Sequence, residues 1–426
     1  MNQPLKVALV SHSDRLGGAS VVTYRLMNAL RKAGVDARMV VFVKTGDDPY
    51  VVEACSRNLR AKLFLSECGS IFAQNGFSKK NLFKISIANS GLQLIDHPWV
   101  KEADVVALNW VNQGMLSLKG VYLLAQSGKP VVWTMHDMWN LTGVCHHAHE
   151  CEGYKDKCGH CQYVWRGLFG NDLSRRVWHK KRELYESVPI HFVAVSNWLA
   201  QLCEQSSLLK NQSVTVIPNA FPIDFYPVSP ALKVDEFGID YNKRLIIMGA
   251  ARLDDPIKGL DYAIEALNIL ADTRPDIAEN SLAVFFGDLK NQSAFDGLRF
   301  PYKHLGRVND PKMLRQLYAT GNVVISTSLY ETLPGTIIEG QAAGCVPVSF
   351  GRGGQADIID HLENGYIAEY KSAQSIADGI SWALECGIDR KLLHESVRSR
   401  FASDVVAQRY IELFNRLLSE RKQSSK

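Results

Sequence analysis

Two hydrophobic patterns alternate along the chain. Short apolar runs have the length of buried strands, and between them apolar residues recur every three or four positions, as on one face of a helix. The first helical stretch carries Val22, Leu26, Ala29 and Leu30, after a glycine-rich turn. Strands are predicted at 5–10, 38–43, 105–110, 130–135 and 191–195. This alternation predicts a parallel sheet with helices on both faces.

The same alternation restarts in the second half. Strands are predicted at 245–249, 282–286, 322–326 and 346–350, with helices at 261–271 and 310–318 between them. A proline-rich stretch, 210–230, separates the halves. Because a chain of 426 residues exceeds the ~250 to 300 residues at which one core stops growing, we predict two α/β domains with parallel sheets.

The linker sets the domain boundaries. Residues 1–215 form the predicted N-terminal domain, and residues 216–402 the C-terminal one. The last helix, 403–421, has a single apolar stripe and is expected to pack back on the N-terminal domain.

Composition excludes several classes of protein. A hydrophobic fraction of 46% and a charged fraction of 22% are those of an ordinary globular protein. The net charge of +4 is too small for a nucleic-acid-binding surface, so no nucleic-acid partner is expected. The apolar runs are too short for a signal peptide or a membrane span, which predicts a cytoplasmic protein.

The stretch 326–350 contains the most informative polar residues. Glu331 lies in a loop before a predicted helix, and Glu339 lies one turn inside that helix. The helix start offers unpaired amides and a positive dipole end, where a diphosphate binds, and we expect the amides of Gly335, Thr336 and Ile337 to do so. Carboxylates suit paired hydroxyls, so we expect Glu331 to bind a sugar and Glu339 a ribose.

Two cations precede this stretch. Arg252 follows a predicted strand, and Lys258 precedes a predicted helix in the run GAARLDDPIKG. Two cations in one loop can clamp a diphosphate and offset the charge that grows on it as a leaving group. Alone, each would be a solvated surface charge.

The first half offers a weaker set of residues. Gly17 and Gly18 follow the first predicted strand, and we expect them to bind the donor. The absence of Cβ atoms lets the backbone approach the donor phosphates or the acceptor closely, or simply allows a tight turn. His136 and Asp137 lie at the carboxyl end of a predicted strand, where open parallel sheets bind ligands. Asp137 is a candidate for orienting an imidazole or activating an acceptor hydroxyl.

The order of motifs in the second half resembles that of family-4 glycosyltransferases. The run of motifs is VIPNAF, GAARLDDPIKG, FFGD, HLGRVND and YETLPGTIIEGQAAGCVPV. The resemblance implies the GT-B fold, which is two Rossmann-like domains with parallel sheets facing a central cleft. Two features depart from the commonest pattern: Leu333-Pro334 replaces a Gly-Phe turn, and Ala220 replaces a glycine. Pro334 has no amide to offer a phosphate.

The resemblance also implies the reaction. It implies a retaining transfer of a hexosyl group from a UDP- or GDP-sugar, with no metal or other cofactor at the reaction centre. Arg252 and Lys258 would neutralise the diphosphate, and backbone groups at Arg307 and Val308 would lie near the base. The residues expected to be catalytic are His136, Asp137 and Glu331.

The resemblance suggests an acceptor class and leaves two rivals. A glycan or polyprenol-linked acceptor is expected, in the synthesis of a surface polysaccharide such as lipopolysaccharide or capsule. One rival is a nucleotide-sugar 2-epimerase of the same architecture. The other is a non-catalytic nucleotide-sugar-binding protein.

A cysteine-rich loop follows His136. Cys145, Cys151, Cys158 and Cys161 lie in the run CHHAHECEGYKDKCGHC. Four thiolates suit a structural zinc ion, which is the state we expect, although reduced thiols and a disulfide are alternatives.

Two stretches mix basic and apolar residues. Lys79, Lys80 and Lys84 alternate with apolar residues at 77–85, and five cations surround Val177 and Trp178 at 175–182. Such mixtures suit either a solvated helix face or peripheral contact with the anionic inner face of the plasma membrane.

Overall fold

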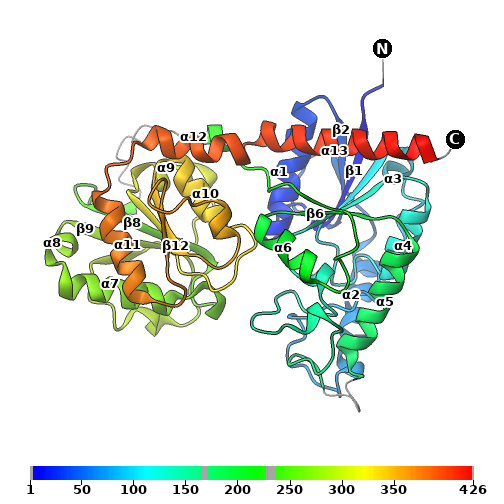
Figure 1. Cartoon of the computed structure of the whole chain (residues 1–426), viewed down its shortest axis with the longest axis horizontal. Coiled ribbons are helices and arrows are strands. Elements are labelled where there is room, and N and C mark those ends of the chain that lie inside the picture. The colour runs from blue at the N-terminus through cyan, green and yellow to red at the C-terminus, as the bar shows by residue number, and fades with distance from the viewer. Residues whose placement is uncertain (1–2, 166–170, 227, 229–236, 425–426) are drawn as a thin grey trace. The chain divides into compact units, whose positions relative to one another are not determined.

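The structure is a computed structural model that describes residues 3–165, 171–226, 228 and 237–424 (Figure 1). The chain divides into two compact units. Unit 1 comprises Met1–Ala220 and Ser403–Lys426, and unit 2 comprises Phe221–Ala402. Pro227 and Pro230 of the predicted linker lie outside the described residues.

Unit 1 is built on a seven-stranded sheet in which all neighbouring strands are parallel. The strand order is β3-β2-β1-β4-β5-β6-β7, so the chain reverses direction across the sheet between β1 and β4. The strands are β1 Lys6–Ser13, β2 Asp36–Val43, β3 Val51–Glu53, β4 Val105–Leu108, β5 Val131–Met135, β6 His191–Ala194 and β7 Val214–Val216.

Helices connect these strands. Four of them begin at a residue whose side chain accepts a backbone N–H bond, Ser56, Ser117, Asp172 or Ser196, which satisfies a donor that the helix leaves free. The helices are α1 Gly18–Lys32, α2 Arg57–Gln74, α3 Pro98–Glu102, α4 Leu118–Gln126, α5 Leu173–Ser187, α6 Asn197–Gln205 and α13 Ser403–Ser424, with short 3-10 turns η1 Trp139–Leu141 and η2 Gly153–Lys155.

Unit 2 repeats the architecture with a six-stranded parallel sheet of order β10-β9-β8-β11-β12-β13. The strands are β8 Arg244–Arg252, β9 Ser281–Asp288, β10 Tyr302–His304, β11 Val323–Ser326, β12 Val346–Phe350 and β13 Tyr366–Ala368. The helices are α7 Leu260–Thr273, α8 Pro275–Glu279, α9 Pro311–Thr320, α10 Gly335–Ala342, α11 Ala373–Glu385 and α12 Arg390–Phe401, with 3-10 turns η4 Ile223–Phe225, η6 Pro256–Lys258, η7 Gln292–Phe295 and η8 Gly354–Asp357.

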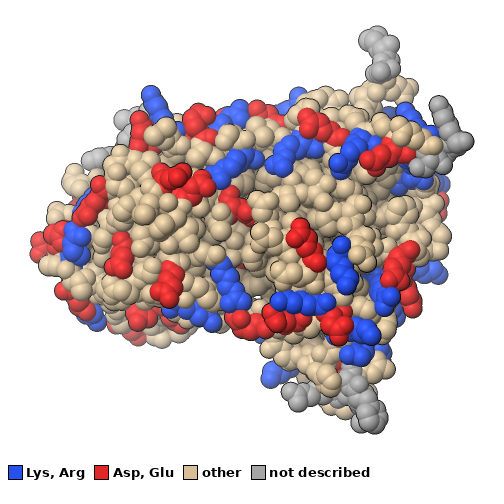
Figure 2. All heavy atoms as spheres, viewed as in Figure 1, with Lys and Arg blue, Asp and Glu red and all other residues tan. Residues whose placement is uncertain are grey.

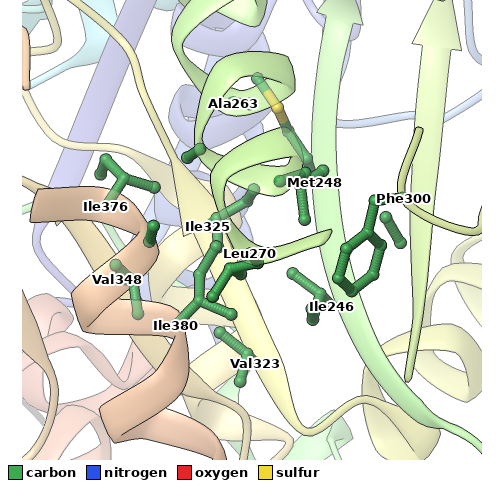
Figure 3. Packing of buried hydrophobic residues seen from close by; sticks show 14 of the residues in the cluster. Ile246, Met248, Ala263, Leu270, Phe300, Val323, Ile325, Val348, Ile376 and Ile380 are labelled. Carbon is green, nitrogen blue, oxygen red and sulfur yellow. The ribbon is translucent and has the colours of Figure 1, made fainter. Parts of the chain in front are cut away.

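The core of unit 2 lies between its central strands and the helices α7 and α11. Ile246, Ile325 and Val348 come from β8, β11 and β12, and they pack against Leu270 and Ile380 of the two helices (Figure 3). These strands are mostly apolar because both faces of a parallel sheet are covered. The covered sheet holds the loops at its carboxyl edge in fixed positions.

The C-terminal helix α13 completes unit 1. It packs against α1, and its Val406, Leu413 and Phe414 join the core that α1 forms with the sheet (Figure 1). Tyr410 is buried, and its hydroxyl lies 2.9 Å from Thr134 Oγ1 on β5.

The chain enters and leaves unit 2 at one place. Phe221, the first residue of the unit, forms a β-bridge with Ala402, the last. The Phe221 amide also donates to the carbonyl oxygen of Phe401 over 2.9 Å.

The predicted fold class is confirmed: both halves of the chain are α/β, with parallel sheets. Each predicted strand is present, with ends that differ by a few residues. Sequence patterns did not predict the four short strands β3, β7, β10 and β13. Among the described residues, no helix is long and apolar enough to cross a membrane.

The packing of α13 gives a first prediction. Phe414→Ala removes a fully buried ring and should lower the free energy of unfolding of unit 1 by about 3 to 5 kcal/mol. Urea unfolding followed by tryptophan fluorescence measures this change. The exposed Glu412→Ala on the same helix is the control and should change stability by less than about 0.5 kcal/mol. Equal effects of the two substitutions would show that α13 does not contribute to the core.

Candidate functional site

The predicted donor residues of unit 2 lie at the carboxyl edge of its sheet. Strand β8 pairs with β9 on one side and with β11 on the other. The loop after β8 leads toward β9 and the loop after β11 leads toward β12, so the two connections diverge between β8 and β11. Open parallel sheets bind ligands at such a point, which is called the switch point of the sheet. Arg252 ends β8, Lys258 ends η6 in the loop after β8, and Glu331 lies in the loop after β11.

Backbone contacts join the loops after β8 and β11. The Leu329 amide donates to the Ile257 carbonyl over 2.8 Å, and the Thr327 hydroxyl donates to the Gly259 carbonyl over 2.8 Å. Gly259 has a φ of +63°, and a Cβ there would lie 2.1 Å from the Thr327 oxygen. Only glycine fits this approach.

A third loop, after β12, holds the Glu331 loop from the other side. The Gly354 amide donates to the Glu331 carbonyl over 3.0 Å. A Cβ on Gly353 would lie 2.5 Å from that same carbonyl oxygen, and one on Gly354 would lie 1.9 Å from the Thr332 oxygen. The buried Gln355 side chain donates to the Ser328 carbonyl. The backbone of residues 328–332 is therefore fixed on both sides.

Opposite charges meet within this arrangement. The Lys258 ammonium forms an ion pair with the Glu331 carboxylate. Burial opposes the charge on Lys258, but the Glu331 carboxylate outweighs it and raises the Lys258 pKa. Arg252 lies 3.4 Å from an oxygen of Asp254 and 3.2 Å from one of Asp255. Both cations thus have carboxylate partners.

The helix α10 begins beside Glu331. Pro334 is its N-terminal capping residue, and no side chain caps this end. The amides of Gly335, Thr336 and Ile337 therefore belong to a helix start without a side-chain acceptor, which attracts anions. Residue Pro334 supplies no amide but sets the start of the helix.

The remaining predicted donor residues are spread along the same edge. Glu339 is buried on α10, and its carboxylate adds to the effect of burial in raising the pKa of the Tyr318 hydroxyl. Arg307 and Val308 follow β10, and the Arg307 guanidinium lies 2.8 Å from Asp288 at the end of β9. The ion pair places Arg307 on the β9 side of Arg252 and Lys258.

In unit 1, a buried carboxylate fixes the loop that leads to the glycine pair. Asp14 accepts bonds from the amide and hydroxyl of Thr45 and from the Gly46 amide, over 2.8 to 2.9 Å. Gly17, the residue before α1, has a φ of +86°, and among the described residues no side chain caps this helix start. A Cβ on Gly17 or Gly18 would meet no atom within 4 Å. The start of α1 is therefore open.

His136 follows β5 and is held by Asn109, which follows β4. Its Nε2 lies 3.0 Å from the Asn109 side-chain oxygen. The Asn109 amide nitrogen donates to the Ala107 carbonyl, so its oxygen faces His136 and the His136 proton lies on Nε2. Burial lowers the His136 pKa from 6.5 to about 4, against a smaller opposing effect of Asp137. The imidazole is neutral at pH 7.

Asp137 has a different imidazole partner. Its carboxylate accepts from Trp110 Nε1 over 2.9 Å, from His146 Nδ1 over 2.7 Å and from the Trp139 amide over 2.8 Å. Burial opposes its charge, but His146 outweighs burial and holds the Asp137 pKa well below the ordinary value. A carboxylate with three donors is suited to positioning and unsuited to accepting a proton.

His146 connects this carboxylate to Ser86. Its Nε2 lies 3.0 Å from the Ser86 hydroxyl, so Asp137, His146 and Ser86 form a relay of hydrogen bonds. Ser86 is buried, with 1% of its surface exposed, so a substrate has no access to this hydroxyl. The relay therefore fixes the loop that begins at Cys145.

The four cysteines of this loop line one cavity of about 20 Å³. Cys145 and Cys158 are buried and Cys151 is exposed, and the Gly143 amide donates to Cys158 Sγ. Among the described residues, no group of three or more histidine, cysteine or acidic side chains is placed to hold a metal ion. The geometry therefore does not support the zinc site that the sequence predicts.

Sequence patterns missed several residues of these edges: Asn109, Trp110, His146, Gly353 and Gly354. A signal was present for some of them. Asn109 and Trp110 are the last two residues of a predicted strand, and Gly353-Gly354 come shortly after another. His146 stood out only as one of the histidines in the cysteine loop.

Two family models cover most of the chain. Residues 16–225 match "Glycosyltransferase Family 4", and residues 234–400 match "Glycosyl transferases group 1". The chain belongs to these glycosyltransferases. The predicted membership of this family and the predicted GT-B fold class are confirmed.

Curated relatives of this glycosyltransferase are distant. An exopolysaccharide phosphotransferase of Streptomyces coelicolor is 28% identical over 243 residues, which make up 54% of this chain and 24% of that protein. An uncharacterized glycosyltransferase of Methanocaldococcus jannaschii is 28% identical over 169 residues, 37% of this chain and 41% of that protein. The chain thus spans less than half the length of either relative.

Solved structures share the fold over nearly the whole length. A glycosyltransferase of Rickettsia africae has a TM-score of 0.64 at 16% identity, covering 97% of this chain and 99% of that one. HepE of Anabaena, solved with UDP-glucose, has a TM-score of 0.59 at 18% identity, covering 96% and 99%. At these identities the likeness shows the fold alone.

The glycine contacts predict the effect of a small substitution. Gly354→Ala would place a Cβ 1.9 Å from the Thr332 oxygen, so the Glu331 loop must move and transferase activity should fall at least about tenfold. Gly297→Ala is the control, because a Cβ there meets no atom within 4 Å. Assays of both variants, each with a circular dichroism spectrum, measure this. Full activity of Gly354→Ala would contradict the role given to this contact.

Neutral, partly buried histidines make unit 1 sensitive to acid. Burial, and then the Arg60 charge, lower the His12 pKa to about 4, and the His136 pKa is also about 4. Below pH ~6.5 the unfolded chain binds protons that the folded chain does not bind until pH ~4, so stability should fall by about 1.4 kcal/mol per pH unit and histidine. Urea unfolding across this pH range measures the slope. His136→Gln should make it shallower by one proton, and an unchanged slope would contradict the neutral imidazole.

Proposed function

We propose that this glycosyltransferase moves a hexosyl group, with retention, from a nucleotide diphosphate sugar to a glycan or lipid-linked acceptor in surface-polysaccharide synthesis. The observation that carries the donor half is the cluster of Lys258, Glu331 and the uncapped start of α10 at the switch point of the unit 2 sheet. This cluster has positive groups for the phosphates of such a donor and a carboxylate for its sugar.

The phosphate part of the donor needs positive charge. Lys258, Arg252 and the amide end of α10 supply it from two adjacent loops. Carboxylates contact both cations, so a diphosphate bound to them would replace one set of anionic oxygens with another. The same cations would stabilise the charge that develops on the leaving diphosphate. Side chains would thus do what a metal ion does in other transferases, which supports catalysis without a metal.

The sugar part needs hydrogen-bond acceptors next to the phosphates. Glu331 contacts Lys258, so a sugar bound to its carboxylate would lie directly beside the diphosphate. Glu339, buried on α10, would accept the ribose hydroxyls, and backbone groups at Arg307 and Val308 would border the base. UDP-glucose bound to HepE, a protein of the same fold, supports a nucleotide-sugar as the donor.

In this proposal unit 1 supplies the acceptor side. The open start of α1 at Gly17 and Gly18 offers backbone amides, and His136 offers a neutral imidazole whose Nδ1 is an acceptor nitrogen. Asp137 has the role of orienting the loop through His146. Retention and the polysaccharide pathway are proposed from the family to which the chain belongs.

Substitutions in the donor cluster test this proposal. A thermal-shift screen of UDP-, GDP- and ADP-sugars identifies the donor, because a ligand that binds the folded state raises the melting temperature. Arg252→Ala, Lys258→Ala and Glu331→Gln should each lower kcat/KM for transfer about 100-fold or more. Arg299→Ala removes an exposed arginine that pairs with Asp272 and should leave transfer unchanged.

Two outcomes would overturn the proposal. If transfer is unchanged in the Arg252→Ala and Glu331→Gln variants, the donor does not bind at this cluster in unit 2. Conversion of the donor to its 2-epimer without any acceptor would identify an isomerase. The anomeric configuration of the product, measured by NMR, tests retention separately.

A further inference from the structure

One segment of unit 1 has an unusual charge composition. Between Glu53 and Asp96 the chain has six Lys and Arg residues and one acid, Glu67, whereas the whole chain has 48 basic and 44 acidic residues. Elsewhere, acidic and basic side chains are interspersed on the face that Figure 2 shows. Arg60 pairs with Glu53, and the exposed cations are Arg57, Lys62, Lys79, Lys80 and Lys84.

The single acid adds no negative charge to the surface. Glu67 is buried, with 2% of its surface exposed, and its two oxygens accept four backbone amides at 87–90 over 2.8 to 3.2 Å. The Glu67 carboxylate thus fixes that loop and is not exposed on the surface. The segment presents a surface of one sign.

Large apolar side chains project from the same segment and from Trp165, which contacts it. Leu65, Phe77, Phe83 and Trp165 expose 66%, 73%, 65% and 63% of their surface. Phe77 also has a φ of +57°, which is rare for a bulky residue, although its side chain is exposed. These side chains do not contribute to the core.

Contacts join the segments of the chain that carry these side chains. Phe83 stacks on Phe64 of α2 at 6.5 Å between ring centroids, and the Asn81 side chain donates to the Tyr163 carbonyl. The Trp165 amide donates to the Asn75 side chain, next to Phe77. We call this set the basic-apolar surface: Leu65, Phe77, Lys79, Lys80, Phe83, Lys84 and Trp165.

The second basic stretch, at 175–182, does not share these properties. Val177, Trp178 and Lys181 are buried, and the Lys181 ammonium donates to the Trp139 and Thr142 carbonyls. Of the two alternatives expected for this stretch, the solvated helix face therefore fits it. The apolar residues of α5 face the core of unit 1.

An anionic lipid bilayer complements the basic-apolar surface. Aromatic and leucine side chains insert into the boundary between headgroups and acyl chains, while the lysines next to them contact anionic headgroups. Neither signal alone gives firm attachment, but both occur here together. A soluble polyanion would use the lysines only and leave the four apolar side chains without a role.

We propose that unit 1 docks peripherally on an anionic membrane through the basic-apolar surface. This inference does not depend on the transferase reaction, because it uses residues outside the proposed donor and acceptor sites. It places the protein where a lipid-linked acceptor would be found.

Vesicle sedimentation of the full chain tests the docking. The protein should pellet with vesicles of phosphatidylcholine mixed with phosphatidylglycerol, and high salt should weaken this binding. Phe77→Asn with Phe83→Ser, and separately Lys79→Glu with Lys80→Glu, should each weaken it about tenfold or more. Asparagine is chosen at position 77 because it tolerates a positive φ.

Lys391→Glu with Leu392→Ser is the matched control. It changes one exposed lysine and one leucine that is 67% exposed on α12 of unit 2, and it should bind vesicles like the unchanged protein. Equal binding to neutral and anionic vesicles, or no loss in the Phe77 and Phe83 variant, would overturn the proposal. Binding to soluble dextran sulfate that needs the lysines, without vesicle binding, would do so as well and indicate a polyanionic glycan instead. Unchanged melting temperatures of all variants establish that they fold.

Discussion

Close packing of backbone on backbone is the constraint on which the unit 2 site depends. At Gly259, Gly353 and Gly354, a Cβ atom would lie 2.5 Å or less from a carbonyl oxygen of a neighbouring loop. Without Cβ atoms, the loops after β8 and β12 can grip the loop after β11 from both sides. This grip brings Glu331 to Lys258, so that opposite charges and the start of α10 share one small region. The chemistry of the site therefore follows from sterics.

In unit 1, carboxylates that accept several hydrogen bonds fix the loops instead. Asp14, Glu67 and Asp137 each accept at least three hydrogen bonds, and each fixes a loop at or near the edge of the sheet. For Asp14 and Asp137, these contacts hold the carboxyl pKa below its ordinary value in spite of burial. The two units thus share an architecture but hold their loops by different interactions.

Much of this could be predicted from the sequence, for physical reasons. Central strands of a covered parallel sheet must be largely apolar, so their runs stand out. Arg252 and Glu331 lie a few residues after the ends of two such runs. Strands of three residues, such as β3 and β10, are too short to carry a pattern and form only because a longer neighbour pairs with them. The bonds from His146 to Asp137 and Ser86 join residues far apart along the chain, and no periodicity encodes them. The stretches at 77–85 and 175–182 are alike in composition, and only the packing of Trp178 distinguishes them.

The bridge between Phe221 and Ala402 has a consequence for how such a protein is assembled in evolution. The first and last residues of unit 2 are hydrogen-bonded neighbours, so topologically this unit is an insertion within unit 1, whose own chain resumes at Ser403. A module with adjacent ends can be exchanged for another without stretching its host. The segment from Phe221 to Ala402 can therefore be replaced as one block while the fold of unit 1 is kept.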